Sequence, residues 1–173
     1  MTQTPNIPPV IESHESNYRD SGVPSTVAIA GHPIHPALIT LPIGLLVVAP
    51  VTDIAYWVLK DVFWARASFW LIAAGLVTGL LAAITGLLDF IRIRRVRQHT
   101  AGWAHMYANV TALVLTAINL GVRLGDPFEN ILFTGLLLSV VVAALLGISG
   151  WYGGELVYRH KIAVIGYGNS EQS

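Results

Sequence analysis

The segment Ile131–Trp151, with the sequence ILFTGLLLSVVVAALLGISGW, decides the fold, because its 21 residues include no charged side chain. A transmembrane helix needs about 20 mainly apolar residues to cross a hydrocarbon core of about 30 Å. A buried helix of a soluble bundle would show a polar face at the helical period, and this segment shows none. We therefore predict a membrane-spanning helix, which satisfies its backbone polar groups internally.

Three further apolar segments precede this one along the chain. They are Ala37–Leu59, Ala67–Phe90 and Ala104–Val122. The connections between them are short, so that sequential helices should be antiparallel. The sequence thus predicts an all-α integral membrane protein, an antiparallel four-helix bundle with both termini on the same side.

The predicted membrane domain comprises residues 31–165. Residues 1–30 are polar and rich in proline, and we expect them to form a flexible N-terminal tail. Residues 166–173 are expected to form a short polar tail at the other end of the chain.

The composition supports a membrane protein and excludes several chemistries. Charged residues are 12% of the 173 residues, about half the roughly 25% that is usual for soluble domains. Ten basic residues balance ten acidic ones, which argues against a nucleic-acid partner. The absence of cysteine excludes disulfides, thiolate nucleophiles, cysteine-ligated iron–sulfur clusters and covalently attached haem. No pattern singles out a serine or threonine nucleophile, so the sequence shows no hydrolytic or transferase signature and leaves a redox role open.

Most basic residues are predicted at one end of the bundle. The end with both termini and the connection between the second and third segments holds Arg19, Arg92, Arg94, Arg95, Arg97, Arg159 and Lys161. The opposite end holds Lys60, Arg66 and Arg123. Cytoplasmic loops carry the excess of basic residues, so we predict that both termini are cytoplasmic.

All six histidines, including His14 in the tail, are predicted at or beyond this basic end. His32 and His35 precede the first span in the sequence GHPIHP, where the prolines stiffen the chain. His105 falls in the first turn of the third span, with Asn109 four residues later on the same helix face. From there, the imidazole of His105 could reach across the bundle toward His35.

Ionisable residues from two other segments join this layer. Asp89 closes the second span, where a carboxylate normally pairs or points inward, and it could orient a ligating imidazole. Glu155 and His160 follow the fourth span, after Gly153, which permits a bend or a close approach. Asp53, by contrast, lies near the opposite end, where we expect a structural role, paired with Arg66 or with polar groups of the bundle.

Four stretches together resemble the bacterial domain-of-unknown-function 2231 family, over roughly residues 30 to 167. They are HPIHPALITLPIGL from His32, LLD ending at Asp89, the spacing Trp103–His105–Asn109, and GGELVYRH ending at His160. The resemblance implies a four-span protein of the bacterial plasma (inner) membrane. Some members are fused to Rieske-type iron–sulfur domains, which implies that a separate Rieske-type or cytochrome subunit could be the redox partner here.

One interpretation is a b-type haem-binding electron-transfer subunit, because imidazole is a common axial ligand of haem iron. His35 with His105 is the first candidate pair of axial ligands, and His32 with His160 is the second. Other groups are expected around the haem: Asp89, Asn109 and Glu155 behind the imidazoles, and Arg92 or Arg159 at the propionates.

Two alternatives remain open at this point. The first is a non-haem zinc, iron or copper site built from His35, Asp89, His105, Glu155 and His160. The second is an anchor or scaffold for a redox complex that binds no cofactor of its own. A homo-oligomer is compatible with each of these interpretations.

Overall fold

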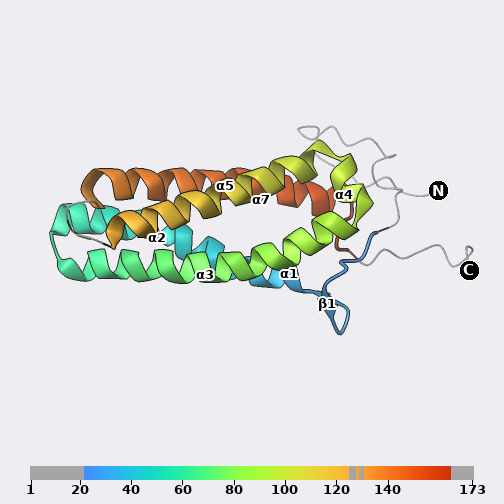
Figure 1. The fold of residues 1–173 in the computed structure, drawn as a ribbon, viewed down its shortest axis with the longest axis horizontal. Helices are drawn as coiled ribbons and strands as arrows, with labels where there is room; N and C mark the ends of the chain where they lie inside the picture. Colours follow the sequence, from blue (N-terminus) through green and yellow to red (C-terminus); the bar gives the residue numbers. More distant parts are fainter. Residues whose placement is uncertain (1–21, 125–127, 129–130, 165–173) are drawn as a thin grey trace, which may run out of the picture.

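The computed structural model describes residues 22–124, 128 and 131–164, and four long helices dominate it (Figure 1). Four segments are long and apolar enough to cross a membrane: Ile34–Leu59, Val62–Arg92, Thr100–Arg123 and Phe133–Tyr158. The predicted all-α membrane bundle is confirmed. The outer parts of the predicted tails, residues 1–21 and 165–173, lie outside the described residues.

The first span consists of two helices, α1 (Ile34–Leu38) and α2 (Thr40–Leu59). Pro42 has no N–H to donate to the carbonyl four residues earlier, which accounts for the interruption near Ile39. The second span is α3 (Val62–Arg92), which begins five residues before the predicted apolar segment. Asp61 explains this early start, since its carboxylate accepts a hydrogen bond from the backbone N–H of Phe63 and caps the helix.

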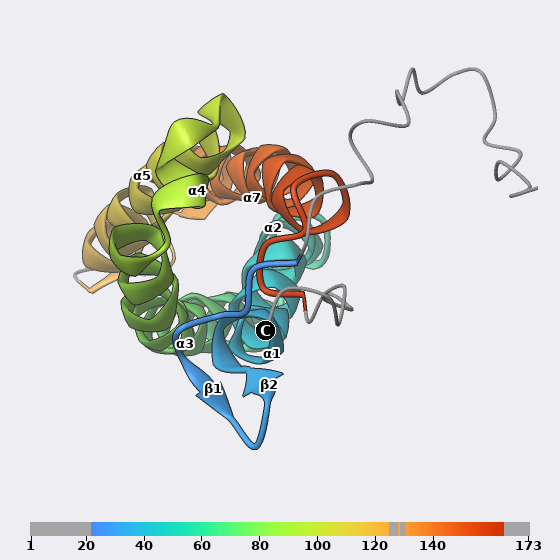
Figure 2. The ribbon, with the colours of Figure 1, turned by 90° about the vertical axis from the view of Figure 1, so that its right-hand side faces the viewer.

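The other two spans follow a short basic helix. This helix is α4 (Arg94–Gln98), and it leads into α5 (Thr100–Arg123). The last span consists of a π-helical turn, η2 (Ile131–Gly135), followed by α7 (Leu136–Tyr158). Helices α2 and α3 pack closely against each other, as do α5 and α7, so the bundle consists of two helical hairpins. Figure 2 shows the four helices arranged as a ring when viewed along the bundle axis.

The described residues before α1 and after α7 lie at the end of the bundle near α4. Strands β1 (Ala28–Ile29) and β2 (His32–Pro33) form a small antiparallel hairpin that projects away from the helices (Figures 1 and 2). Gly31 makes its turn possible with a φ of +79°, a backbone conformation that favours glycine. Val23 pairs in parallel with Ile162, so the two described ends of the chain meet on the same side.

Some of the residues that the sequence assigns to the N-terminal tail contact the bundle. Ser25 and Thr26 both donate hydrogen bonds to the carboxylate of Asp89 at the end of α3. Together with the pairing of Val23, these bonds hold residues 23–26 against the end of the bundle. Their composition resembles that of a tail because backbone hydrogen bonds can be made by any residue type and so are not visible in the composition.

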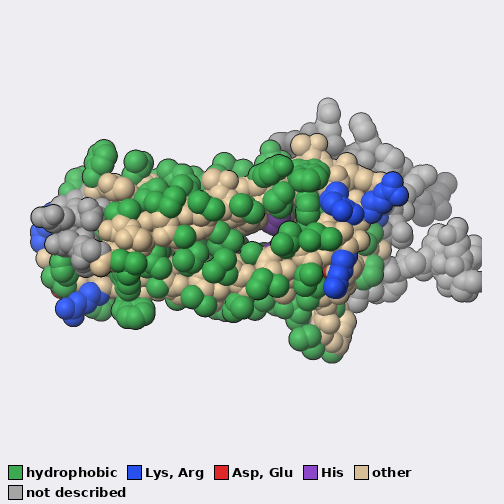
Figure 3. All heavy atoms as spheres, in the orientation of Figure 1, with side chains coloured by type: hydrophobic (Ala, Val, Ile, Leu, Met, Phe, Trp, Pro, Cys, Tyr) green, Lys and Arg blue, Asp and Glu red, His purple; other side chains and the backbone are tan. Residues whose placement is uncertain are grey.

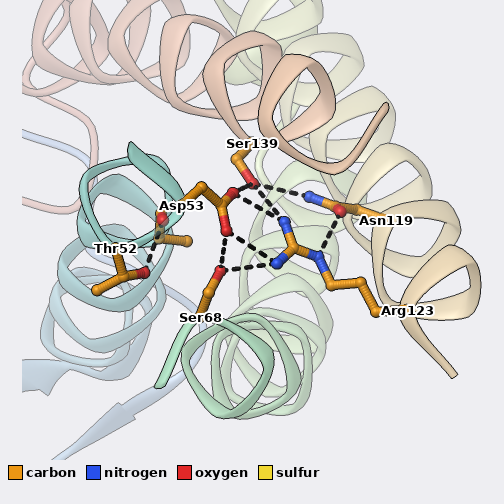
Figure 4. A network of polar contacts seen from close by, with 7 residues as sticks. Thr52, Asp53, Ser68, Asn119, Arg123 and Ser139 are labelled. Carbon is orange, nitrogen blue, oxygen red and sulfur yellow. Dashed lines mark hydrogen bonds and ion pairs between the residues drawn. The ribbon is translucent and has the colours of Figure 1, made fainter. Parts of the chain in front are cut away.

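The end of the bundle opposite α4 holds a fully buried ion pair between Asp53 of α2 and Arg123 of α5 (Figure 4). The guanidinium donates to both oxygens of the Asp53 carboxylate and also to the hydroxyls of Ser68 in α3 and Ser139 in α7. Asn119 accepts from the Nε of Arg123 and donates to Ser139. This Asp53–Arg123 network therefore ties all four spans together.

Arg123, rather than Arg66, is the partner of Asp53. Arg66 follows the start of α3 and is exposed, whereas Arg123 points inward from the last turn of α5. Among the described residues, no buried side-chain nitrogen or oxygen lacks a hydrogen-bond partner. Complete pairing is what makes two charges tolerable inside an apolar bundle.

Replacing Asp53 by Ala should lower the free energy of unfolding by about 3–5 kcal/mol, because Arg123 would remain as a buried and unpaired charge. Arg66→Ala is the matched control and should change it by less than about 0.5 kcal/mol. Steric trapping in detergent micelles measures both. The double variant Asp53→Leu with Arg123→Met should be more stable than Asp53→Ala. Equal losses for Asp53→Ala and Arg66→Ala would contradict the structural role of the network.

Candidate functional site

The half of the bundle near α4 encloses a cavity of about 480 Å³ between the four spans. Figure 3 shows an opening between the helices with a histidine side chain visible in it. Cofactor and small-molecule sites have volumes of roughly 300–1,000 Å³ and are mostly apolar with a few polar groups. The polar residues that line this cavity include His35, Asp89, His105, Asn109 and Ser149.

Two histidines meet in this cavity. His35 comes from α1 and His105 from α5, so each hairpin contributes one imidazole. The ring centroids are 6.2 Å apart, and the ring planes are perpendicular. The structure thus brings together the pair that the sequence placed first among the candidate ligands.

Each imidazole is held by a backbone carbonyl of the second helix in its own hairpin. Nδ1 of His35 donates to the carbonyl oxygen of Ala82 in α3, at 2.9 Å. Nδ1 of His105 donates to the carbonyl oxygen of Ser149 in α7, also at 2.9 Å. Because a carbonyl oxygen only accepts, Nδ1 carries the proton in both rings, and the lone pair of Nε2 is left for a ligand.

A glycine lies against each ring, one helical turn beyond the carbonyl that holds it. A Cβ atom at Gly86 would lie 2.7 Å from Cε1 of His35, and one at Gly153 would lie 3.0 Å from Cε1 of His105. Only a glycine lets the helix backbone approach the imidazole this closely. The two hairpins therefore share one arrangement. The histidine lies on the first helix, and the second helix carries two small residues four positions apart, of which one offers its carbonyl and the other is the glycine.

Sequence reasoning did not single out Gly86, and it interpreted Gly153 only as a bend or a close approach. The available signal was the four-residue spacing of small residues near the end of each second helix, Ala82 to Gly86 and Ser149 to Gly153. That spacing is common in membrane helices, so it does not distinguish a site from ordinary helix packing.

Asn109 lies behind His105, on the same face of α5. Its side-chain amide donates to the backbone carbonyl of His105 at 2.8 Å and to the hydroxyl of Ser149 at 2.6 Å. The same hydroxyl lies 3.0 Å from Nδ1 of His105. Asn109 thus acts on the imidazole through Ser149.

Asp89 lines the cavity but orients neither imidazole. Its carboxylate accepts hydrogen bonds from the hydroxyl of Ser25 at 2.6 Å and from the backbone and hydroxyl of Thr26 at 2.7 Å. Backbone carbonyls take the role that the sequence had suggested for this carboxylate. Through these hydrogen bonds, Asp89 instead holds Ser25 and Thr26 against the end of α3.

His160 and Glu155 belong to a separate cluster. The ring of His160 stacks on that of His99, with centroids 3.6 Å apart, and its Nε2 lies 3.9 Å from a carboxylate oxygen of Glu155. Partial burial and the neighbouring His99 lower the pKa of His160. Both histidines are half-buried at the end of the bundle.

The remaining predicted site residues lie outside the cavity. His32 is exposed in β2, and its Nδ1 is hydrogen-bonded to the carbonyl oxygen of Ala30. No ring contact joins His32 to His160 in the described part of the chain, so the second candidate pair is not assembled. Arg92 and Arg159 are exposed at this end of the bundle, and His14 lies outside the described residues.

The five residues of the alternative metal site are thus divided among three places. His35 and His105 share the cavity, Asp89 binds residues 25 and 26, and Glu155 lies beside His160. Within residues 22–124, 128 and 131–164, no three His, Asp or Glu side chains come close enough to hold one metal ion.

A family model described as "Predicted membrane protein (DUF2231)" matches residues 31–166. The chain belongs to this family. The resemblance expected from the HPIHP and GGELVYRH stretches is thereby confirmed. No curated protein and no solved structure matches this DUF2231 chain.

Replacing Gly86 of this DUF2231 protein by Ala should lower its stability by about 1–3 kcal/mol, because the new methyl group displaces the His35 ring from a packed position. Gly147→Ala is the matched control, since a Cβ atom there meets nothing within 4 Å. That change should leave stability unchanged or raise it by up to about 1 kcal/mol. Unfolding midpoints in detergent would measure the contrast, and a Gly86→Ala protein as stable as Gly147→Ala would refute the close packing.

Proposed function

We propose that this membrane protein is a b-type haem protein in which His35 and His105 are the two axial ligands and which transfers electrons. The distance between the two rings carries the proposal. An imidazole nitrogen lies about 1.1 Å from its ring centroid and binds a transition metal at about 2.0–2.1 Å. Two imidazoles on opposite sides of one iron therefore have centroids about 6.3 Å apart, and His35 and His105 are separated by 6.2 Å.

The hydrogen bonds of the two rings support the same ligands. Metal-ligating histidines almost always donate their other ring N–H to a carbonyl, a carboxylate or a water, which fixes the tautomer and the ring orientation. His35 and His105 both make this bond through Nδ1. The two imidazoles are therefore preorganised to offer Nε2 to a metal before any metal binds.

The composition of the cavity lining also supports this proposal. Helices α3 and α7, which carry neither of the two histidines, line it with small residues. They are Gly79, Ala82, Ala83, Gly86, Gly150, Gly153 and Gly154. Small side chains on these helices leave room beside the two imidazoles, and the exposed Arg92 and Arg159 at the same end are suited to bind carboxylates such as the haem propionates.

If haem were bound, His35 and His105 would hold its iron from both sides, and the haem would supply one-electron transfer rather than substrate activation. The chain supplies the apolar surroundings and the hydrogen bonds that set the reduction potential. We propose a separate Rieske-type or cytochrome subunit as its redox partner, since the chain has no cysteine to bind an iron–sulfur cluster of its own.

The protein purified in detergent from cells supplied with a haem precursor should show a Soret band that shifts on reduction by dithionite, with sharp α and β bands. His35→Ala and His105→Ala should each lose more than about nine-tenths of the bound haem, since one axial ligand would be missing. His32→Ala and His99→Ala are the matched controls and should keep it.

Other outcomes identify the alternatives. A featureless spectrum with stoichiometric zinc, iron or copper would contradict haem binding and favour a non-haem site at the same two histidines. A featureless and metal-free protein would favour the anchor or scaffold. Haem that survives both His35→Ala and His105→Ala would place the haem elsewhere.

We also propose that the protein resides in the bacterial inner membrane with both termini in the cytoplasm, on the basis of the arginines near α4. The chain has no cysteine, so single cysteines introduced at exposed positions report the orientation. In intact spheroplasts, a membrane-impermeant maleimide should label Lys60→Cys but not Gln98→Cys, and detergent should make Gln98→Cys reactive. The reverse labelling pattern would invert the proposed orientation.

A further inference from the structure

The two imidazoles in the cavity are held by similar hairpins, but their hydrogen bonds differ. Nδ1 of His105 lies within hydrogen-bond distance of two oxygens of Ser149, the carbonyl at 2.9 Å and the hydroxyl at 3.0 Å. Among the described residues, Nδ1 of His35 has one acceptor, the carbonyl of Ala82. That carbonyl also accepts a hydrogen bond from the hydroxyl of Thr85, at 2.8 Å.

The hydroxyl of Ser149 is held in place beside His105. Ser149 is only 3% exposed, and Asn109 donates a hydrogen bond of 2.6 Å to the hydroxyl oxygen. Asn109 also donates to the backbone carbonyl of His105, so that residues 105, 109 and 149 form one connected group between α5 and α7. At His35 the hydroxyl of Thr85 has the opposite effect, because it competes with the imidazole N–H for the same carbonyl.

We infer that Ser149 and Thr85 make the two axial ligands unequal and thereby set the reduction potential of the haem. The inference rests on the proposed function, and it makes both residues positioning residues that act through an imidazole. A stronger hydrogen bond from Nδ1–H raises the basicity of the ligating nitrogen, and a more basic ligand favours the oxidised iron. The Ser149 hydroxyl therefore lowers the potential through His105, and the Thr85 hydroxyl raises it through His35.

The test is a redox titration of the haem-loaded protein and its variants in detergent. Ser149→Ala removes one acceptor from His105 and should shift the midpoint potential upward. Thr85→Val keeps the shape of the side chain, frees the Ala82 carbonyl for His35, and should shift the potential downward. Ser149→Thr keeps the hydroxyl and should restore a potential close to that of the original protein.

Thr78→Val is the matched control on the same helix. The Thr78 hydroxyl donates to the carbonyls of Ala74 and Gly75, and its removal changes no bond to either imidazole. A potential for Ser149→Ala or Thr85→Val that does not move beyond that of Thr78→Val would overturn the inference, as would shifts of the same sign.

A second measurement separates this inference from the haem proposal, because it needs no haem. In protein labelled with ¹⁵N-histidine, Ser149→Ala should move the Nδ1 resonance of His105 and leave that of His35 in place, while Thr85→Val should do the reverse. Unmoved resonances would overturn the unequal hydrogen bonding even if haem binds. Unequal resonances in a protein that binds no haem would overturn the proposed function and the control of a potential, while the hydrogen-bond arrangement would stand.

Discussion

The buried ion pair between Asp53 and Arg123 is the interaction on which the arrangement of the two hairpins depends. Inside a bilayer, helices gain little from hydrophobic burial against each other, so packing and polar contacts determine which helices associate. The network around this pair reaches α3 through Ser68 and α7 through Ser139. One fully paired set of polar groups thus fixes how α2, α3, α5 and α7 lie relative to one another at the end opposite α4.

The end near α4 is built differently, because it contains the cavity. Atoms that line a cavity lack packing contacts on one side, and the resulting loss of stability grows with the volume of the cavity. The bonds from His35 to Ala82 and from His105 to Ser149 each lie within one hairpin. They position the imidazoles without closing the space between the hairpins, and at this end the hairpins are joined instead by the pairing of Val23 with Ile162 and by a buried apolar cluster that includes Ile93 and Leu156.

The sequence was sufficient to predict the spans and the meeting of His35 with His105, and it failed where the acceptor is a backbone atom. Charge-free segments of membrane length identify helices, and short connections place the starts of the first and third spans at the same end. The rotation of each helix about its own axis cannot be read from the sequence in this way, so the sequence predicts Arg66 or polar groups of the bundle as partners of Asp53 and does not identify Arg123. Any residue type can offer the backbone carbonyl that Ala82 and Ser149 provide, so the sequence does not identify these acceptors. It predicts an imidazole as the partner of Asp89 because the polar residues 25 and 26 resemble a flexible tail.

The division of the site between the hairpins would link the binding of the proposed cofactor to the stability of the bundle. His35 belongs to the first hairpin and His105 to the second, so a cofactor held by both rings would bridge the two where their own contacts are interrupted by the cavity. A ligand that binds only the assembled form stabilises it in proportion to the logarithm of its concentration relative to its dissociation constant. Gly86 and Gly153 help to hold the two rings in place, because they let each imidazole lie directly against the backbone of the neighbouring helix. Both rings are thus held in place within their own hairpins, so a cofactor that bound to them would not lose affinity through the entropy cost of ordering the two side chains.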